Sequence, residues 1–104
     1  MSDVALFYVT FPSKAEAERI AETLLAERLA ACVNIMAPCN SMYRWEGRIE
    51  RAEEVPAIIK TRPMLATRLR ERLTDLHSYE LPVIEDWTTA TSEAVGRWMA
   101  SETG

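Results

Sequence analysis

Few side chains of this sequence can do chemistry, and the only histidine, His77, is the first of them. Tyr79 and Glu80 follow it closely. An imidazole beside a carboxylate can bind a metal ion or carry a proton near neutral pH. In the alternative interpretation His77 ends a helix, where a cation is favoured by about 0.3–1 kcal/mol. We treat His77 and Glu80 as candidate metal ligands. They are also a candidate acid/base pair, but no nucleophile or cofactor motif accompanies them, so we expect no enzyme.

Cys32 and Cys39 are the other candidate metal ligands. Seven positions apart on one extended strand, they would point to opposite faces and lie about 23 Å apart. A disulfide needs Cα atoms within about 7 Å, which would require a sharp reversal near Pro38. The sequence has no C-x2-C pair and no Cys/His cluster, which argues against a structural zinc site. We expect both thiols to be reduced and buried, with Cys32 either packed as a small apolar residue or acting as a ligand.

Glu54 and Lys60 form a second polar group within one expected strand. Six positions separate them, so an unbroken strand directs both side chains to the same face. Lys60 adjoins an apolar run, and a partly buried lysine requires a carboxylate partner. Two interpretations follow. One is a polar pocket between subunits that also includes His77 and Tyr79, and the other is a salt bridge across a subunit interface.

Large apolar side chains mark an expected hairpin whose arms meet at Glu46-Gly47. The glycine and its β-favouring flanks predict a tight turn there. Tyr43, Trp45 and Ile49 lie near the tip, where one small domain has little core to cover them. An exposed aromatic patch on a two-stranded arm indicates a partner. No basic groove accompanies these rings, so we predict an interface between subunits rather than a platform for bases.

Length and composition fit a single globular domain spanning residues 1–104. The net charge is −4 and no basic patch is present, so we expect no nucleic-acid partner. No apolar run approaches the roughly 18 residues that span a bilayer, and no signal peptide precedes Asp3. We therefore expect a cytoplasmic protein without a membrane partner.

The periodicity of apolar residues predicts a mixed α+β order. Strands are expected at 4–9, from about 31, in the two hairpin arms up to 59, and at 83–87. Helices are expected after Ser13, which forms a capping box with Glu16, after Pro63, and over 92–100. Pro56 removes one donor from the sheet, so it should lie at an edge or a bulge.

Thr10-Phe11-Pro12 and Thr61-Arg62-Pro63 occupy equivalent strand-to-helix junctions. The strand–helix–strand pattern therefore occurs twice, which is typical of a ferredoxin-like βαββαβ sandwich, here with a short C-terminal helix added. Two helices cover only one face of such a sheet. A neighbouring subunit is the natural cover for the other face.

Four ordered motifs carry a family resemblance. They are Leu29-Ala30-Ala31-Cys32-Val33-Asn34, then Ser41-x-Tyr43-x-Trp45-Glu46-Gly47-x-Ile49, then Glu54 with Ile59-Lys60-Thr61, then His77-x-Tyr79-Glu80-x-Pro82. Across nearly its whole length the chain resembles the CutA1 family of divalent-cation tolerance proteins. The resemblance implies a ferredoxin-like fold, an extended hairpin between the second and third strands, and a homotrimer. It also implies tolerance of copper and other divalent ions, with no ion required for folding. The trimer is similar to that of the PII signalling proteins, so a module that binds a small metabolite between subunits is the alternative.

Departures from the family pattern bear on the copper role. Some members carry a cysteine and an acid that are implicated in copper binding, at the positions of Val9 and Val83, and valine cannot ligate. Pro-Gly and His-Pro-Tyr of the family become Pro38-Cys39 and His77-Ser78-Tyr79. Three copies of Cys39 around a threefold axis would supply three thiolates, a soft set suited to Cu(I) if they converge.

Overall fold

The computed structural model describes residues 1–104. The chain forms five strands, three α-helices and one 3-10 turn in an elongated body with extents of 45 × 24 × 24 Å. The strands are β1 (Ser2–Phe11), β2 (Cys32–Ile35), β3 (Cys39–Trp45), β4 (Arg48–Thr61) and β5 (Ile84–Thr91). The helices are α1 (Lys14–Ala26), α2 (Ala66–Leu76), which follows the 3-10 turn η1 (Pro63–Leu65), and α3 (Glu93–Glu102).

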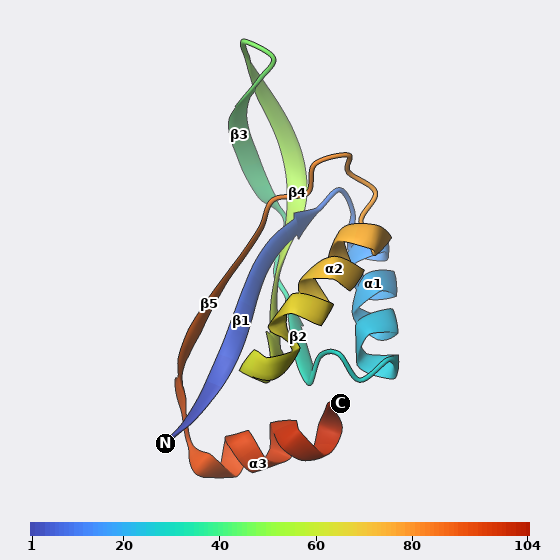
Figure 1. Cartoon of the computed structure of the whole chain (residues 1–104). Helices are drawn as coiled ribbons and strands as arrows, with labels where there is room; N and C mark the ends of the chain where they lie inside the picture. Colours follow the sequence, from blue (N-terminus) through green and yellow to red (C-terminus); the bar gives the residue numbers. More distant parts are fainter.

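The sheet is antiparallel, in the order β2-β4-β1-β5, with β3 pairing to the outer half of β4. The α1 and α2 helices lie side by side on one face, and the β3–β4 hairpin extends beyond the sheet (Figure 1). The α3 helix crosses the opposite end, near both termini (Figure 1). This arrangement confirms the predicted α+β, ferredoxin-like sandwich with its extended hairpin and C-terminal helix.

The core lies between the sheet and the two helices. On the sheet side it consists of the alternate residues of β1 and β4, all at most 5% exposed: Ala5, Phe7, Val9, Phe11, Val55, Ala57 and Ile59. On the helix side it consists of Ala17, Ile20 and Leu24 of α1 with Leu69 and Leu73 of α2. Both helix stripes therefore match the apolar period of the sequence.

The expected second strand is divided into β2 and β3, and Pro38 lies in the break between them. Ile35 pairs with Ala57, and Cys39 pairs with Glu54. Between these two pairs the segment from β2 to β3 advances by four residues while β4 advances by only three. The extra residue makes a bulge. Pro56 lies opposite this break, which confirms the predicted position, and its carbonyl accepts a hydrogen bond from the Met36 N–H at 2.9 Å.

The first and the last strands of the chain are longer than expected. β1 spans Ser2–Phe11 rather than 4–9, and β5 spans Ile84–Thr91 rather than 83–87. Their ladder runs from the Ser2–Thr91 pair to the Val9–Ile84 pair. The end of β5 is exposed on both faces, so hydrophobic alternation does not reveal it, although threonine favours strands.

Candidate functional site

His77 is the C-cap residue of α2, and its ring is buried. The Nδ1 atom accepts a hydrogen bond from the Tyr79 N–H at 3.1 Å. The Nε2 atom lies 2.8 Å from the Thr10 carbonyl oxygen, so it carries the proton and donates. The ring also stacks on Phe11 at a centroid distance of 5.0 Å. Both nitrogens of a neutral imidazole are thus engaged, which leaves His77 without a lone pair for a metal ion.

Glu16 holds the segment after His77, a role that the sequence did not reveal. The Ser13 hydroxyl accepts from the Glu16 N–H at 3.1 Å, which forms the first half of the predicted capping box. The Glu16 carboxylate, however, accepts from the Ser78 N–H at 3.1 Å and from the Ser78 hydroxyl at 2.9 Å. The second half of the box is therefore replaced by a contact to this segment. A proline at position 78 could not donate the backbone bond.

Glu54 and Tyr79 form the closest polar contact of the site. The Tyr79 hydroxyl donates to the Glu54 carboxylate at 2.6 Å. Burial alone would raise the pKa of Glu54, but hydroxyl donors, including those of Ser41 and Thr10, together lower it below its usual value. Glu54 is therefore a buried, ionised carboxylate at neutral pH.

A pocket of about 680 Å³ opens around this pair. It lies where the hairpin leaves the sheet, and the segment from Tyr79 to Val83 forms one wall. Its lining residues are Tyr8, Thr10, Ser41, Met42, Tyr43, Arg44, Trp45, Glu54, Tyr79, Glu80, Leu81 and Val83. The structure thus brings the predicted residues Glu54, Tyr79 and Glu80 together with two aromatic rings of the hairpin.

Lys60 and His77, predicted for a cleft between subunits, do not line this pocket of the single chain. Lys60 is six residues from Glu54 along β4, about 20 Å in a strand. It lies on the same face, as predicted, and forms no ion pair within the chain. The His77 ring lies behind Tyr79, and the two rings contact each other at a centroid distance of 4.7 Å.

Cys32 and Cys39 are free thiols, and both are half-buried rather than fully buried. They lie opposite Lys60 and Glu54 respectively, which places them about 20 Å apart along β4. Because the bulge adds one residue, both side chains point to the same face instead of opposite faces. Within one chain no group of three His, Cys, Asp or Glu side chains is placed to hold a metal ion.

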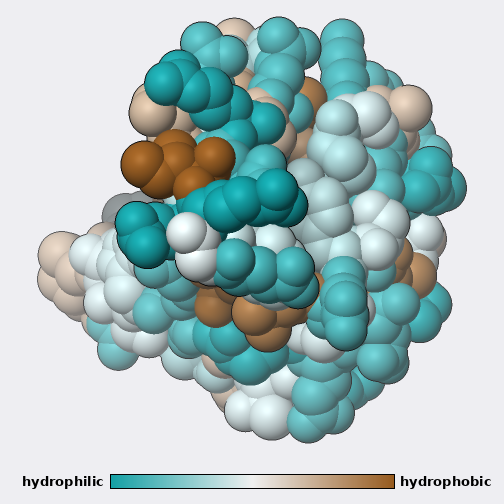
Figure 2. Space-filling model, turned by 90° about the horizontal axis from the view of Figure 1, so that it is seen from above, coloured by the Kyte–Doolittle hydropathy of each residue, from teal (hydrophilic) through white to brown (hydrophobic).

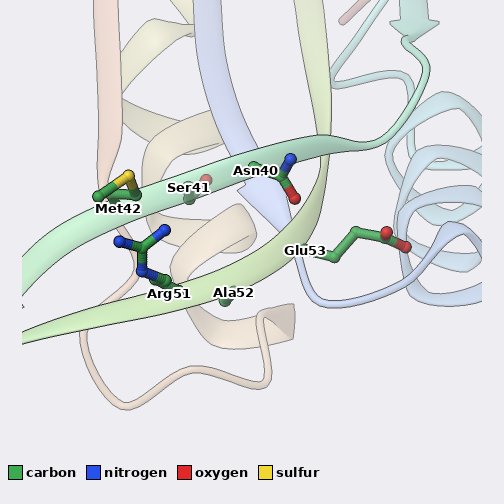
Figure 3. Close-up of a pocket in the computed structure, with 6 residues that line it drawn as sticks. All are labelled: Asn40, Ser41, Met42, Arg51, Ala52 and Glu53. Atoms are coloured by element: carbon green, nitrogen blue, oxygen red, sulfur yellow. The ribbon is translucent and has the colours of Figure 1, made fainter.

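A smaller hollow of about 420 Å³ lies on the hairpin itself. Asn40, Ser41 and Met42 line it from β3, and Arg51, Ala52 and Glu53 line it from β4 (Figure 3). The Arg51 side chain lies near Met42, while the Glu53 side chain extends away (Figure 3). No aromatic or buried charged group lines it, so the larger pocket is the better candidate site.

The sheet face away from the helices is uncovered. Leu6, Tyr8 and Ile58 are only half-buried there, and Trp87, paired with Leu6, is 45% exposed. Apolar groups also form patches among hydrophilic ones at the hairpin end (Figure 2). On the hairpin, Tyr43 and Trp45 share one face and are each 44% exposed.

Ile49 lies opposite Arg44, on the other face of the hairpin from these rings, and it is 65% exposed. Tyr43, Trp45 and Ile49 therefore do not form the single patch that the sequence indicated. The turn itself is as predicted, with positive φ at Glu46 (50°) and Gly47 (80°).

Residues 5–102 match the family described as the CutA1 divalent ion tolerance protein. The chain belongs to the CutA1 family. The divalent-cation tolerance protein CutA of Pyrococcus horikoshii is 41% identical over 99 residues, which is 94% of this chain and 96% of that protein. The CutA of Archaeoglobus fulgidus is 49% identical over 77 residues, 74% of each chain.

Solved CutA structures share the fold. The crystal structure of CutA1 from Pyrococcus horikoshii matches with a TM-score of 0.91 at 40% identity, covering 96% of this chain and 98% of that one. CutA from Xylella fastidiosa matches with a TM-score of 0.93 at 36% identity, covering 99% and 100%. The CutA relatives include one named periplasmic and one named chloroplastic. No helix of this chain has the length and apolar character needed to cross a membrane.

Proposed function

We propose that this CutA1 protein works as a cytoplasmic, non-enzymatic homotrimer that binds or responds to copper and other divalent ions. The uncovered sheet face is the observation that carries the assembly. Phe7 and Ile59 on the helix-covered face are at most 1% exposed, whereas Leu6, Ile58 and Trp87 on the other face remain accessible. Burying such a face against two further copies would remove apolar surface from water at about 25 cal/mol per Å².

Cys39 is the side chain through which assembly and copper binding would be linked. It lies on the uncovered face at the start of β3, and its thiol is 3.7 Å from the Ser41 hydroxyl. One chain offers no chelating group around it. A threefold arrangement would bring three such thiols toward one axis, and thiolates select Cu(I).

Titration of the reduced protein with Cu(I), with light scattering on the same samples, tests the proposal. We expect one ion per trimer in the wild-type protein and loss of that binding in Cys39→Ser. Cys32→Ser is the matched control, because it removes the other free thiol of the same face about 20 Å away. Binding of one ion per chain, or binding unchanged by Cys39→Ser, would contradict the role of Cys39.

The pocket favours a second candidate function, a PII-type signalling module that binds a small metabolite. Its volume of about 680 Å³ is within the range of small-molecule sites, and it combines aromatic walls with a buried carboxylate. In a trimer its open side would lie close to a neighbouring subunit. A thermal-shift screen separates the two candidates, because only the second predicts stabilisation by an organic molecule in the absence of metal ions.

A further inference from the structure

The pocket beneath the Tyr79–Val83 segment has the composition of a site for a positively charged ligand. Four aromatic side chains line it, Tyr8 from β1, Tyr43 and Trp45 from β3, and Tyr79. Glu54 lies at its base and Glu80 at its rim. We infer that this pocket binds a small organic cation through an ammonium group. The inference rests on the second candidate function and names the ligand class of that site.

Glu54 supplies the negative charge that such a ligand would neutralise. Its side chain is 8% exposed, and it forms no ion pair with any lysine or arginine of the chain. A buried charge without an opposite charge is costly. Arg44 is the only basic residue of the lining, and it is exposed and unpaired as well. Within one chain, the Glu54 carboxylate of the pocket therefore lacks an ion-pair partner.

The polar groups next to Glu54 favour a ligand that donates hydrogen bonds. The Tyr79 hydroxyl already donates to the Glu54 carboxylate, and the hydroxyls of Ser41 and Thr10 help to lower the pKa of that carboxylate. The Tyr79 hydroxyl has one proton, which it uses in the hydrogen bond to Glu54, so its remaining lone pairs can only accept. Next to Glu54, a ligand group that donates hydrogen bonds is therefore favoured; an ammonium group donates them and a carboxylate does not. The donors of the lining, Arg44 and Trp45, belong to the hairpin.

The electrostatic field in the pocket agrees with this chemistry. Burial raises the pKa of Tyr8, and the negative charges of Glu54 and Glu85 add to the rise. Burial and the Glu54 carboxylate raise the pKa of Tyr79. A negative potential that suppresses ionisation of two tyrosines attracts a cation. Aromatic faces add cation–π attraction, which is strengthened when the cation is desolvated.

Calorimetric titration with three ligands of one shape and different charge tests the inference. Phenethylammonium is the cation, phenethyl alcohol the neutral analogue and phenylacetate the anion. We expect the cation to bind at least about tenfold more tightly than either analogue. If the alcohol or the anion binds equally well or better, the pocket is a ligand site but the cation inference is wrong. If none of the three binds, the inference fails together with the second candidate function.

Matched variants locate the binding site. Glu54→Gln keeps the shape of the side chain and removes its charge, and we expect about a tenfold loss of phenethylammonium affinity. Glu53→Gln is the control, because the exposed Glu53 adjoins Glu54 on β4 and does not line this pocket. Should Glu54→Gln fail to fold, Glu80→Gln removes the charge at the rim and must also weaken binding. Unchanged affinity in the folded charge variants would overturn the inference, and light scattering on the same samples reports the oligomeric state separately.

Discussion

At the residue scale, the hydrogen bond from Tyr79 to Glu54 joins the segment after α2 to the base of the hairpin. It spans 2.6 Å and ends on a carboxylate that is almost fully buried. Hydrogen bonds to charged groups contribute more to stability than hydrogen bonds between neutral groups. In a buried site water cannot replace such a bond once it is lost. This contact therefore fixes the position of the pocket wall.

Tyr79→Phe removes this hydrogen bond and leaves the ring in place. We expect a loss of about 1.5–3 kcal/mol in the free energy of unfolding near neutral pH. The pKa of Glu54 is lowered in the folded chain, so its stabilising contribution is complete above the unfolded value of about 4.3 and is lost as the pH falls through the lowered folded value. The difference in the free energy of unfolding between the wild-type protein and Tyr79→Phe should consequently become smaller below about pH 4.

Urea unfolding at a series of pH values measures this difference. Tyr43→Phe serves as the control, since Tyr43 lines the same pocket but is 44% exposed. Equal stability of Tyr79→Phe and the wild-type protein at pH 7 would show that the hydrogen bond contributes nothing.

The sequence identified Glu54, Tyr79 and Glu80 but not the residues that surround them. Thr10 and Ser41 are small polar residues of ordinary strands, and only the register of β1, β4 and β3 brings their hydroxyls to Glu54. His77 was the natural metal candidate because it is the only imidazole. Its ring donates one hydrogen bond to a carbonyl 67 residues away and accepts another from a local N–H, and no pattern in the sequence indicates either bond.

At the element scale, the α3 helix is fastened across the end of the sheet by close packing. A Cβ atom at Gly96 would overlap the Ser2 side chain at the start of β1. Two arginines hold the other end of this region. Arg28 donates to the Ser101 carbonyl at 2.8 Å, and Arg62 donates to the Thr103 hydroxyl at 2.9 Å.

Gly96→Ala tests this packing. Alanine in an exposed helix stabilises by about 1 kcal/mol relative to glycine. Here we expect the reverse: overpacking against Ser2 should lower the free energy of unfolding by about 1–3 kcal/mol. The double variant Ser2→Gly/Gly96→Ala should recover most of the loss in urea unfolding, because it removes the atoms that collide. A single variant at least as stable as the wild-type protein would rule out the close approach of α3 to β1.

Periodicity predicted α1 and α2 well because each of them buries a continuous apolar stripe. Ala17, Ile20 and Leu24 follow the helical period and are all at most 2% exposed. The bulge between β2 and β3 was only partly predictable. The prolines indicated an irregularity, but the single extra residue follows from pairing with β4. That residue reverses the faces of Cys39 and of every hairpin side chain after it.

At the scale of the whole molecule, one sheet face is packed and the other is open. The open face carries Leu6, Tyr8, Ile58 and Trp87, and it continues along the hairpin through Tyr43 and Trp45. We propose that copies of the chain cover this face. The aromatic residues of the hairpin indicated an interface in the sequence. Ile49, however, lies on the other face of the hairpin, so the face to which a side chain belongs can be assigned only when the strand register is known.

Leu6→Glu places a charge in the middle of the open face and should dissociate the assembly. Charged groups are costly in a desolvated interface, and Leu6 lies directly between Lys60 and Trp87 in the sheet. Met64→Glu is the matched control, because Met64 is 75% exposed in the 3-10 turn that precedes α2. Light scattering should show smaller particles for Leu6→Glu only. The same mass for both variants would exclude the open face as the interface.

Sedimentation equilibrium of the wild-type protein at micromolar concentration is the most direct test of the proposed assembly. One chain has a mass of 11.8 kDa, so we predict a single species of three times this mass, about 35 kDa. A species of 11.8 kDa would contradict the covering of the open sheet face by neighbouring copies, and with it the convergence of three Cys39 thiols.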